Sequence, residues 1–186
     1  MTILALADRA PNVSIIDLIT THHVDLICTL GDLSYFALKE LEVVTNIPKI
    51  GVYGNHCSGN YFELLDIYNL HLKTFEYRGL VFGGFEGSVR YKESPYAKMY
   101  TQAEAKELLT DFPLVDVFLA HSPPYGINDE PNSPTHQGLL ALREYIEQKP
   151  VKYFLHGHTY PNEDTLIKKY RDTHIVYVHG VKILQI

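Results

Sequence analysis

Residues 25–35, with the sequence DLICTLGDLSY, combine an apolar run with an acidic turn. The apolar residues up to Leu30 predict a buried strand, and the pair Gly31-Asp32 ends it abruptly. We therefore expect Asp32 to stand at the carboxyl end of this strand. A Gly-Asp pair after a strand is by itself typical of an ordinary turn, so the meaning of Asp32 depends on the rest of the chain.

Polar side chains of the same kind follow four other apolar runs. Each of these runs is rich in β-branched or aliphatic residues and predicts a strand. Because the carboxyl ends of parallel strands meet at one edge of a sheet, we expect the residues that follow them to lie close together. Outward from Asp32, the residues at these positions are Asp8, Asn55 and His56 in the motif GNH, His121, and His158 in the motif HGHT.

Strand patterns alternate with helical patterns along the chain. Strands are predicted at 2–7, 24–30, 49–54, 115–120 and 151–155, and helices at 13–23, 35–44, 60–68, 101–112 and 138–148. Residues 73–91 predict a central hairpin, and residues 173–179 and 182–186 predict two closing strands that meet at a glycine-containing turn. The mixture predicts an α/β fold with two packed sheets and helices outside, forming a single domain over residues 1–186.

The composition restricts the range of functions. A chain of 186 residues with 46% hydrophobic and 20% charged residues is long enough for a real core, and its net charge of −6 argues against general nucleic-acid or membrane-surface binding. No apolar run approaches the roughly 18 residues that span a bilayer, and the first residues do not resemble a signal peptide. With two cysteines and no disulfide framework, we expect a cytoplasmic protein. The sequence does not indicate an oligomeric state.

Carboxylate, amide and imidazole side chains at the predicted strand ends are the ligands that divalent metal ions take in proteins. An aspartate whose two oxygens face different ions can bridge a pair held roughly 3.5–4 Å apart. Such a pair lowers the pKa of a bound water and clamps the oxygens of a phosphoryl group. The strand-end residues therefore indicate a metal site suited to phosphoryl chemistry.

The order D…GD…GNH…H…GH, from Asp8 to His158, resembles the calcineurin-like metallophosphoesterase superfamily. The resemblance implies a four-layer αββα sandwich of two mixed β-sheets flanked by helices. It also implies two divalent ions (Mn²⁺, Fe²⁺/Fe³⁺ or Zn²⁺), with Asp8 binding the first and Asp32 bridging both. Asn55, His121 and His158 would bind the second ion, and His56 would contact the substrate phosphate and assist the leaving oxygen.

The chain departs from the family pattern at three places. Ala10 stands where the motif D-x-H has its histidine, and Tyr160 stands where G-H-x-H has its last histidine. Cys57 replaces the acidic residue that follows GNH. Both missing histidines belong to the first metal site, so the second site is complete while the first is depleted.

One alternative would repair the first site. Purple acid phosphatases, a branch of the same superfamily, use a tyrosine within G-D-x-x-Y, and the segment from Gly31 to Tyr35 fits that spacing. A Tyr35 phenolate would favour a trivalent iron. Tyr160 and His156 are further candidates beside the metals, and His136 is a candidate for reaching the pocket.

The resulting hypothesis is a metal-dependent phosphoesterase that hydrolyses a phosphomonoester or phosphodiester with a metal-bound hydroxide. Arg9 and Arg90 are candidates for binding the phosphate, and the loop at 122–135 and the glycine-rich hairpin are expected to form the pocket walls. The partner would be a small phosphorylated molecule. The alternative is a catalytically weak or inactive scaffold that binds a protein partner, as the retromer subunit of this fold does.

Overall fold

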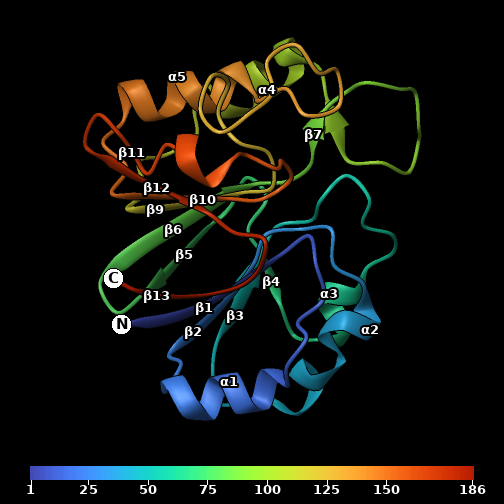
Figure 1. Cartoon of the computed structure of the whole chain (residues 1–186), viewed down its shortest axis with the longest axis vertical. Coiled ribbons are helices and arrows are strands. Elements are labelled where there is room, and N and C mark those ends of the chain that lie inside the picture. Colours follow the sequence, from blue (N-terminus) through green and yellow to red (C-terminus); the bar gives the residue numbers. More distant parts are fainter.

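A computed structural model describes residues 1–186 and consists of two large sheets stacked face to face (Figure 1). The five-stranded sheet has the order β13-β1-β2-β3-β4, with bounds Gly180–Gln185, Thr2–Ala7, Leu26–Thr29, Lys49–Gly51 and Tyr68–Asn69. The six-stranded sheet has the order β11-β12-β10-β9-β6-β5, with bounds Lys169–Tyr170, Thr173–Tyr177, Tyr153–His156, Val117–Ala120, Leu80–Phe85 and Thr74–Tyr77. A small third sheet pairs β7 (Ser88–Val89) with β8 (Met99–Tyr100).

The alternation of side chains along the strands builds three apolar layers. On β1, Ile3 and Ala5 face the other sheet, whereas Leu4 and Leu6 face the helices on the outer side. On β9, Leu119 likewise packs between the sheets and Phe118 packs outward. A strand has a side-chain period of two, so a strand that is apolar on every residue must be covered on both faces.

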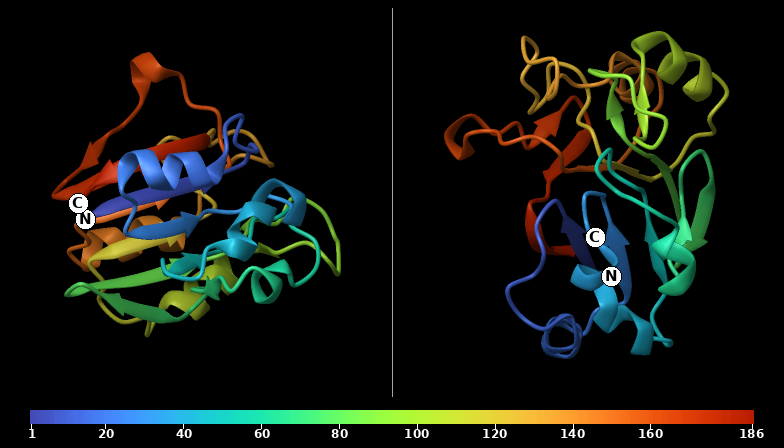
Figure 2. Two further views of the ribbon diagram at one scale, coloured as in Figure 1. Left: turned by 90° about the horizontal axis from the view of Figure 1, so that it is seen from below. Right: turned by 90° about the vertical axis from the view of Figure 1, so that its right-hand side faces the viewer.

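Helices cover the outer faces of both sheets, as Figure 2 also shows. The five-stranded sheet is covered by α1 (Ile15–His22), α2 (Tyr35–Leu38), the 3₁₀ helix η1 (Lys39–Val43) and α3 (Tyr61–Leu64). The six-stranded sheet is covered by α4 (Gln102–Leu109) and α5 (Leu140–Gln148). A second 3₁₀ helix, η2 (Glu163–Thr165), precedes β11. The four-layer αββα sandwich predicted from the sequence is confirmed.

Two helices are shorter than their sequence patterns predict. The pattern at 35–44 becomes one α-helical turn followed by η1, and the pattern at 60–68 becomes the single turn α3. The α3 turn ends because Asp66 adopts a left-handed backbone with φ 52°, after which Tyr68–Asn69 joins the sheet as β4. Residues 68 and 69, at and just beyond the end of the predicted helix, therefore form an edge strand instead.

The two closing strands form as predicted but do not pair with each other. The strand β12 lies parallel to β10 in the six-stranded sheet, whereas β13 lies antiparallel to β1 in the five-stranded sheet. The predicted terminal hairpin is therefore wrong, because the chain crosses from one sheet to the other between Tyr177 and Gly180. Both termini lie side by side, and the Met1 ammonium donates to the Ile186 carbonyl at 2.7 Å.

The chain contains no helix that is both long and apolar enough to cross a lipid bilayer.

Candidate metal centre

Five strands from the two sheets end at a common edge and deliver the predicted polar side chains there. Asp8 directly follows β1, and His121 directly follows β9. Asp32, Asn55 and His158 follow β2, β3 and β10 after short turns. The candidate centre is thus built from both sheets, and neither sheet alone contains it.

The backbone at this edge adopts conformations that ordinary side chains avoid. Asp8, Asp32 and His158 have φ values of 61°, 52° and 71°, all in the left-handed region. Such conformations cost roughly 1–3 kcal/mol each and cluster at functional sites, where the surrounding structure enforces them. Three of the five predicted ligands therefore stand in strained positions that aim their side chains into the cluster.

Two glycines allow the strand tips to approach each other closely. A Cβ on Gly31 would lie 2.4 Å from the Gly54 nitrogen and 2.7 Å from His121 Nδ1. A Cβ on Gly54 would lie 2.1 Å from Asp32 Oδ1. The glycines of GD and GNH are thus required by the space that the ligand side chains occupy.

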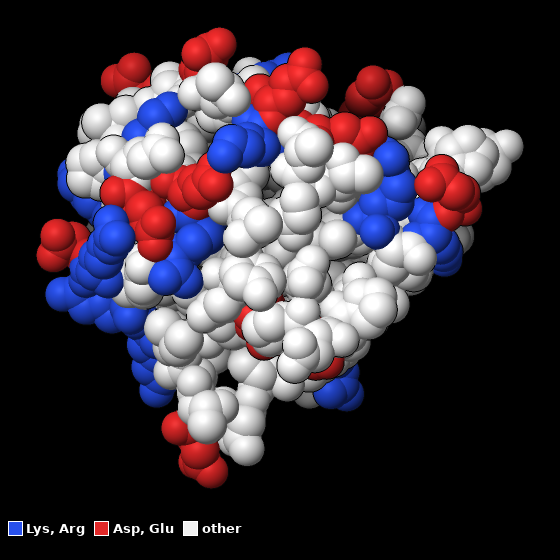
Figure 3. Space-filling view, turned by 90° about the horizontal axis from the view of Figure 1, so that it is seen from above, with Lys and Arg blue, Asp and Glu red and all other residues white.

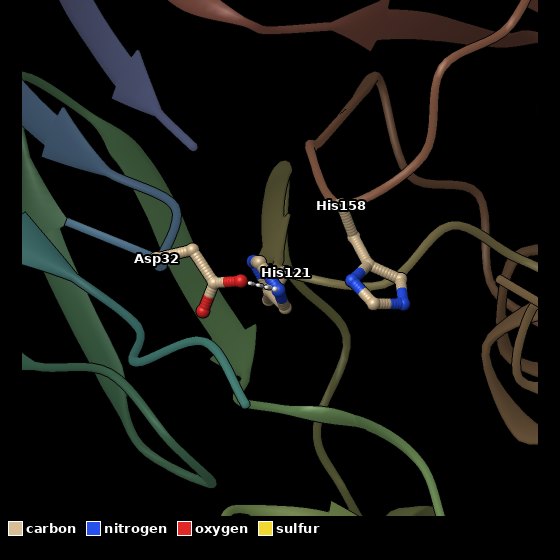
Figure 4. Close-up of side chains that lie close together, drawn as sticks. All are labelled: Asp32, His121 and His158. Carbon is tan, nitrogen blue, oxygen red and sulfur yellow. Dashed lines mark ion pairs between the residues drawn. The ribbon is translucent and has the colours of Figure 1, made fainter. Parts of the chain in front are cut away.

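The side chains of Asp32, His121 and His158 point toward one another (Figure 4). Each can offer one ligand atom to the same point, since these atoms all lie within 4.8 Å of one another. His121 Nε2 lies 3.4 Å from Asp32 Oδ2 and 3.0 Å from Asn55 Oδ1. Carboxylate, amide and two imidazoles therefore converge on one small volume.

The outward nitrogens of both histidines are held by backbone carbonyls. His121 Nδ1 lies 2.7 Å from the Leu30 oxygen, and His158 Nε2 lies 2.8 Å from the Thr135 oxygen. A histidine that donates one N–H to a carbonyl keeps the other nitrogen as a lone pair, which is the arrangement found around protein-bound metals. The donor set therefore fits a divalent ion bound by Asp32, Asn55, His121 and His158.

The electrostatics of the cluster follow from burial and from the proximity of opposite charges. Burial opposes ionisation of Asp32, but His121 and the His56 N–H outweigh it and lower the Asp32 pKa to about 2. Burial disfavours a charged His121, but Asp32 and Asp8 together raise its pKa above the ordinary value. Burial lowers the pKa of His158 to about 3, so this imidazole is neutral and ready to act as a ligand. The ionised Asp32 carboxylate therefore attracts positive charge to this place.

Asp8 lies beside this group on the side of the predicted first ion. Its carboxylate is buried, with Oδ2 accepting the His158 N–H at 2.9 Å and Oδ1 lying 3.9 Å from His121 Nδ1. Burial raises the pKa of Asp8, although His121 and the His158 N–H act in the opposite direction. The carboxylate accepts no hydrogen bond besides the one from His158, so it has lone pairs left for an ion.

His56 and Cys57 also form hydrogen bonds with Asp32. The His56 side chain is exposed, and its backbone N–H donates to Asp32 Oδ1 at 2.9 Å. Cys57 Sγ accepts the N–H groups of Asp32 and Gly54, each at 3.2 Å. The thiol at the place of the family's acidic residue therefore ties the two strand tips together.

The structure places Tyr35 and Arg90 in contacts outside the cluster. The Tyr35 hydroxyl donates to Glu42, which raises the tyrosine's pKa and makes a phenolate ligand harder to form. Arg90 forms an ion pair with Glu104 at 2.9 Å. Arg9 is exposed next to Asp8 and forms no ion pair.

The remaining candidates lie near His158 in space or in sequence. His136 meets the rings of His158 and Tyr160 edge-on, at centroid distances of 5.6 and 5.7 Å. The Thr135 oxygen, at the end of the loop at 122–135, lies 2.8 Å from His158 Nε2, so this end of the loop reaches the site. Tyr160 is mostly exposed. His156 is fully buried and held by Asn128 at 3.2 Å, and burial lowers its pKa to about 4.

The sequence patterns do not predict His179 as a site residue, yet it lies beside Asp8. Its Nδ1 lies 3.9 Å from Asp8 Oδ2, and its ring lies 5.5 Å from that of Tyr160. The residue follows β12 in the crossing between the sheets, where no local motif marks it. Only the pairing of β13 with β1 brings it to Asp8.

Comparison with known proteins agrees with this geometry. The family model for calcineurin-like phosphoesterases matches residues 6–162. A search of curated protein sequences finds no match.

Solved structures share the fold at low sequence identity. The crystal structure of TT1561 from Thermus thermophilus is 17% identical with a TM-score of 0.64, covering 95% of this chain and 88% of that one. A hypothetical protein from the same organism is 17% identical with a TM-score of 0.54, covering 97% and 76%. These similarities show the fold alone. With the family match extending from the end of β1 beyond His158, the chain belongs to the calcineurin-like phosphoesterase family.

Proposed function

We propose that this protein hydrolyses a phosphomonoester or phosphodiester of a small molecule, using two divalent ions such as Mn²⁺. The observation that carries the proposal is the convergence of Asp32, His121 and His158, with their ligand atoms within 4.8 Å of one another. Divalent ions supply Lewis acidity and an activated water when bound in such a site.

Three residues of the chain would hold the cation, protonate the leaving oxygen and bind the phosphate. Asp32, with its pKa lowered to about 2, stays ionised at any physiological pH and holds the cation charge in place. His56 is exposed beside Asp32 and offers an imidazole proton to the departing oxygen. Arg9, exposed and without an ion pair, is free to contact the phosphate.

A groove beside His56 gives room for the organic part of a substrate. It has a volume of about 630 Å³ and is lined by Asp32, Leu33, Ser34, Tyr35, Phe36, His56, Cys57, Ser58, Gly59, Asn60, Tyr61, Glu63 and Leu64. None of these residues is Lys or Arg, so His56 is the one side chain of the groove that could carry a positive charge. It favours an uncharged, partly apolar leaving group over a polyphosphate.

We do not expect general nucleic-acid binding, because the net charge of the chain is −6. On the face over α4 and α5, Lys and Arg side chains are interspersed with Asp and Glu (Figure 3). A nucleic-acid binder normally gathers basic residues in a patch or stripe. The two buried, unpaired cysteines fit the reducing conditions of the cytoplasm, where we place the protein's activity.

The test is hydrolysis of generic phosphomonoesters and phosphodiesters by metal-free protein supplied with Mn²⁺. We expect turnover that is lost in Asp32→Asn. In His56→Ala, we expect turnover to fall about 10²–10⁴-fold. This loss should be larger for an alkyl than for a nitrophenyl leaving group, because the poorer leaving group depends more on a proton.

The proposal would be rejected if the folded protein hydrolysed no ester with any divalent ion. Its measured rates would then be indistinguishable from those of Asp32→Asn. Hydrolysis of monoesters without diesters, or the reverse, decides the substrate class.

A further inference from the structure

The Asp8 side of the centre lacks both histidines of the family pattern, yet an imidazole lies there. Ala10 and Tyr160 occupy the two family positions. His179 approaches Asp8 from a different part of the chain, with Nδ1 at 3.9 Å from Oδ2. A histidine is thus present on this side, although no family motif supplies it.

The position of His179 is fixed by strand pairing. In the antiparallel pair of β1 and β13, Ala7 lies opposite Gly180, which sets the residue before Gly180 opposite Asp8. The Val178 N–H donates to the His156 oxygen at 2.8 Å and anchors the other side of the crossing. The backbone on both sides of His179 is therefore tied to strands that also carry ligands.

The distance between the two side chains suits a shared ion better than a direct bond. At 3.9 Å, Nδ1 and Oδ2 are too far apart for a hydrogen bond. Two ligand atoms at about 2.0–2.2 Å from one ion stand about 3.9 Å apart when they subtend roughly 130–140° at it. His179 forms no hydrogen bond elsewhere, so its ring nitrogens are available to a ligand.

Aromatic neighbours hold the imidazole in this orientation. The Tyr160 ring meets His179 at 5.5 Å and 74°, and the Tyr177 ring stacks on it at 6.5 Å and 12°. Tyr160, which stands where the family has a ligand, thus contacts the histidine that lies beside Asp8.

We propose that His179 is a ligand of the first metal ion, which it shares with Asp8. The proposal rests on the metal dependence proposed above. A histidine from the crossing between the sheets takes the place of the two histidines that the chain lacks. Tyr160 is a positioning residue that acts through His179.

Metal stoichiometry tests the proposal without reference to turnover. Metal-free protein is equilibrated with Mn²⁺, passed through a desalting column and measured for bound metal, and its EPR spectrum is recorded. We expect two ions and a spin-coupled spectrum for the wild type. His179→Ala should hold one ion with the spectrum of isolated Mn²⁺.

The matched control is His174→Ala, which removes an exposed histidine from β12, the strand that precedes His179, and should keep two ions. Circular dichroism establishes that each variant is folded, and His179→Gln replaces His179→Ala if the latter is not. Two ions in a folded His179 variant, or only one in the wild type, would overturn the proposal while leaving the hydrolase in place. No bound ion and no turnover in the wild type would overturn both.

Discussion

At the scale of single residues, Cys57 shows how a departure from the family pattern is accommodated. Its buried thiol accepts two backbone N–H groups, from Asp32 and Gly54, and contacts the Tyr61 hydroxyl at 3.2 Å. Burial raises the pKa of the thiol, so it stays neutral. A neutral acceptor holds the Asp32 tip without adding a second negative charge beside the Asp32 carboxylate.

Removing this acceptor should destabilise the strand tips. Cys57→Ala leaves two buried or half-buried N–H groups without a partner, at about 1–3 kcal/mol each, and should weaken Mn²⁺ binding. Cys57→Ser keeps an acceptor and should retain more of the stability and more of the Mn²⁺ affinity than Cys57→Ala. Urea unfolding and metal titration measure the two effects.

Cys28→Ala serves as the control, because Cys28 is buried between the sheets and its thiol makes no hydrogen bond. Equal losses of metal affinity in Cys28→Ala and Cys57→Ala would contradict the positioning role of Cys57.

At the scale of elements, the sequence predicted a helix correctly where a local interaction sets the boundary of that helix. The helix predicted at 101–112 forms as α4, with Thr101 Oγ1 accepting the Glu104 N–H at 3.1 Å and Glu104 accepting the Thr101 N–H at 2.7 Å. The sequence pattern Thr-x-x-Glu predicts this reciprocal capping. The helix predicted at 60–68 fails because β4 pairs with β3, a contact that no local pattern records.

The capping box should contribute to stability but not to the site. Thr101→Ala should lower the free energy of unfolding by about 1 kcal/mol, because one helix N–H loses its partner. Metal binding should not change. Thr110→Ala, which removes a hydroxyl bonded to Lys106 at the other end of α4, should cost less in the same denaturant titration. A larger loss in Thr110→Ala would contradict the assigned cap.

At the scale of the whole molecule, the centre exists only because two sheets align their strand ends. The predicted strand-end residues Asp8, Asp32 and His121 could be read from the sequence, because each follows an apolar run directly or after one or two residues. The position of His179 could not, because it depends on which sheet β13 joins. The ion pair of Arg90 could not be predicted from the sequence either, because its partner Glu104 lies in another element.

Buried neutral histidines tie the stability of the metal-free protein to pH. Burial lowers the pKa of His71 and of His156 to about 4, and that of His158 to about 3. Below about pH 6.5 these histidines bind protons in the unfolded chain but stay neutral in the folded chain. The free energy of unfolding therefore falls as pH falls toward these pKa values. In this pH window, each of these histidines should lower the free energy of unfolding by about 1 kcal/mol per pH unit.

Urea unfolding of metal-free protein between pH 6.5 and 4.5 measures this slope. His71→Gln should reduce it by the share of one histidine, and the exposed His174→Gln should leave it unchanged. The same slope in wild type and His71→Gln would show that His71 is not held neutral by burial.

The most direct test of the metal centre is an anomalous difference map from crystals grown with Mn²⁺. The account predicts a peak surrounded by Asp32 Oδ2, Asn55 Oδ1, His121 Nε2 and His158 Nδ1. A map without density at this point, or with Mn²⁺ bound only elsewhere on the protein, would contradict it.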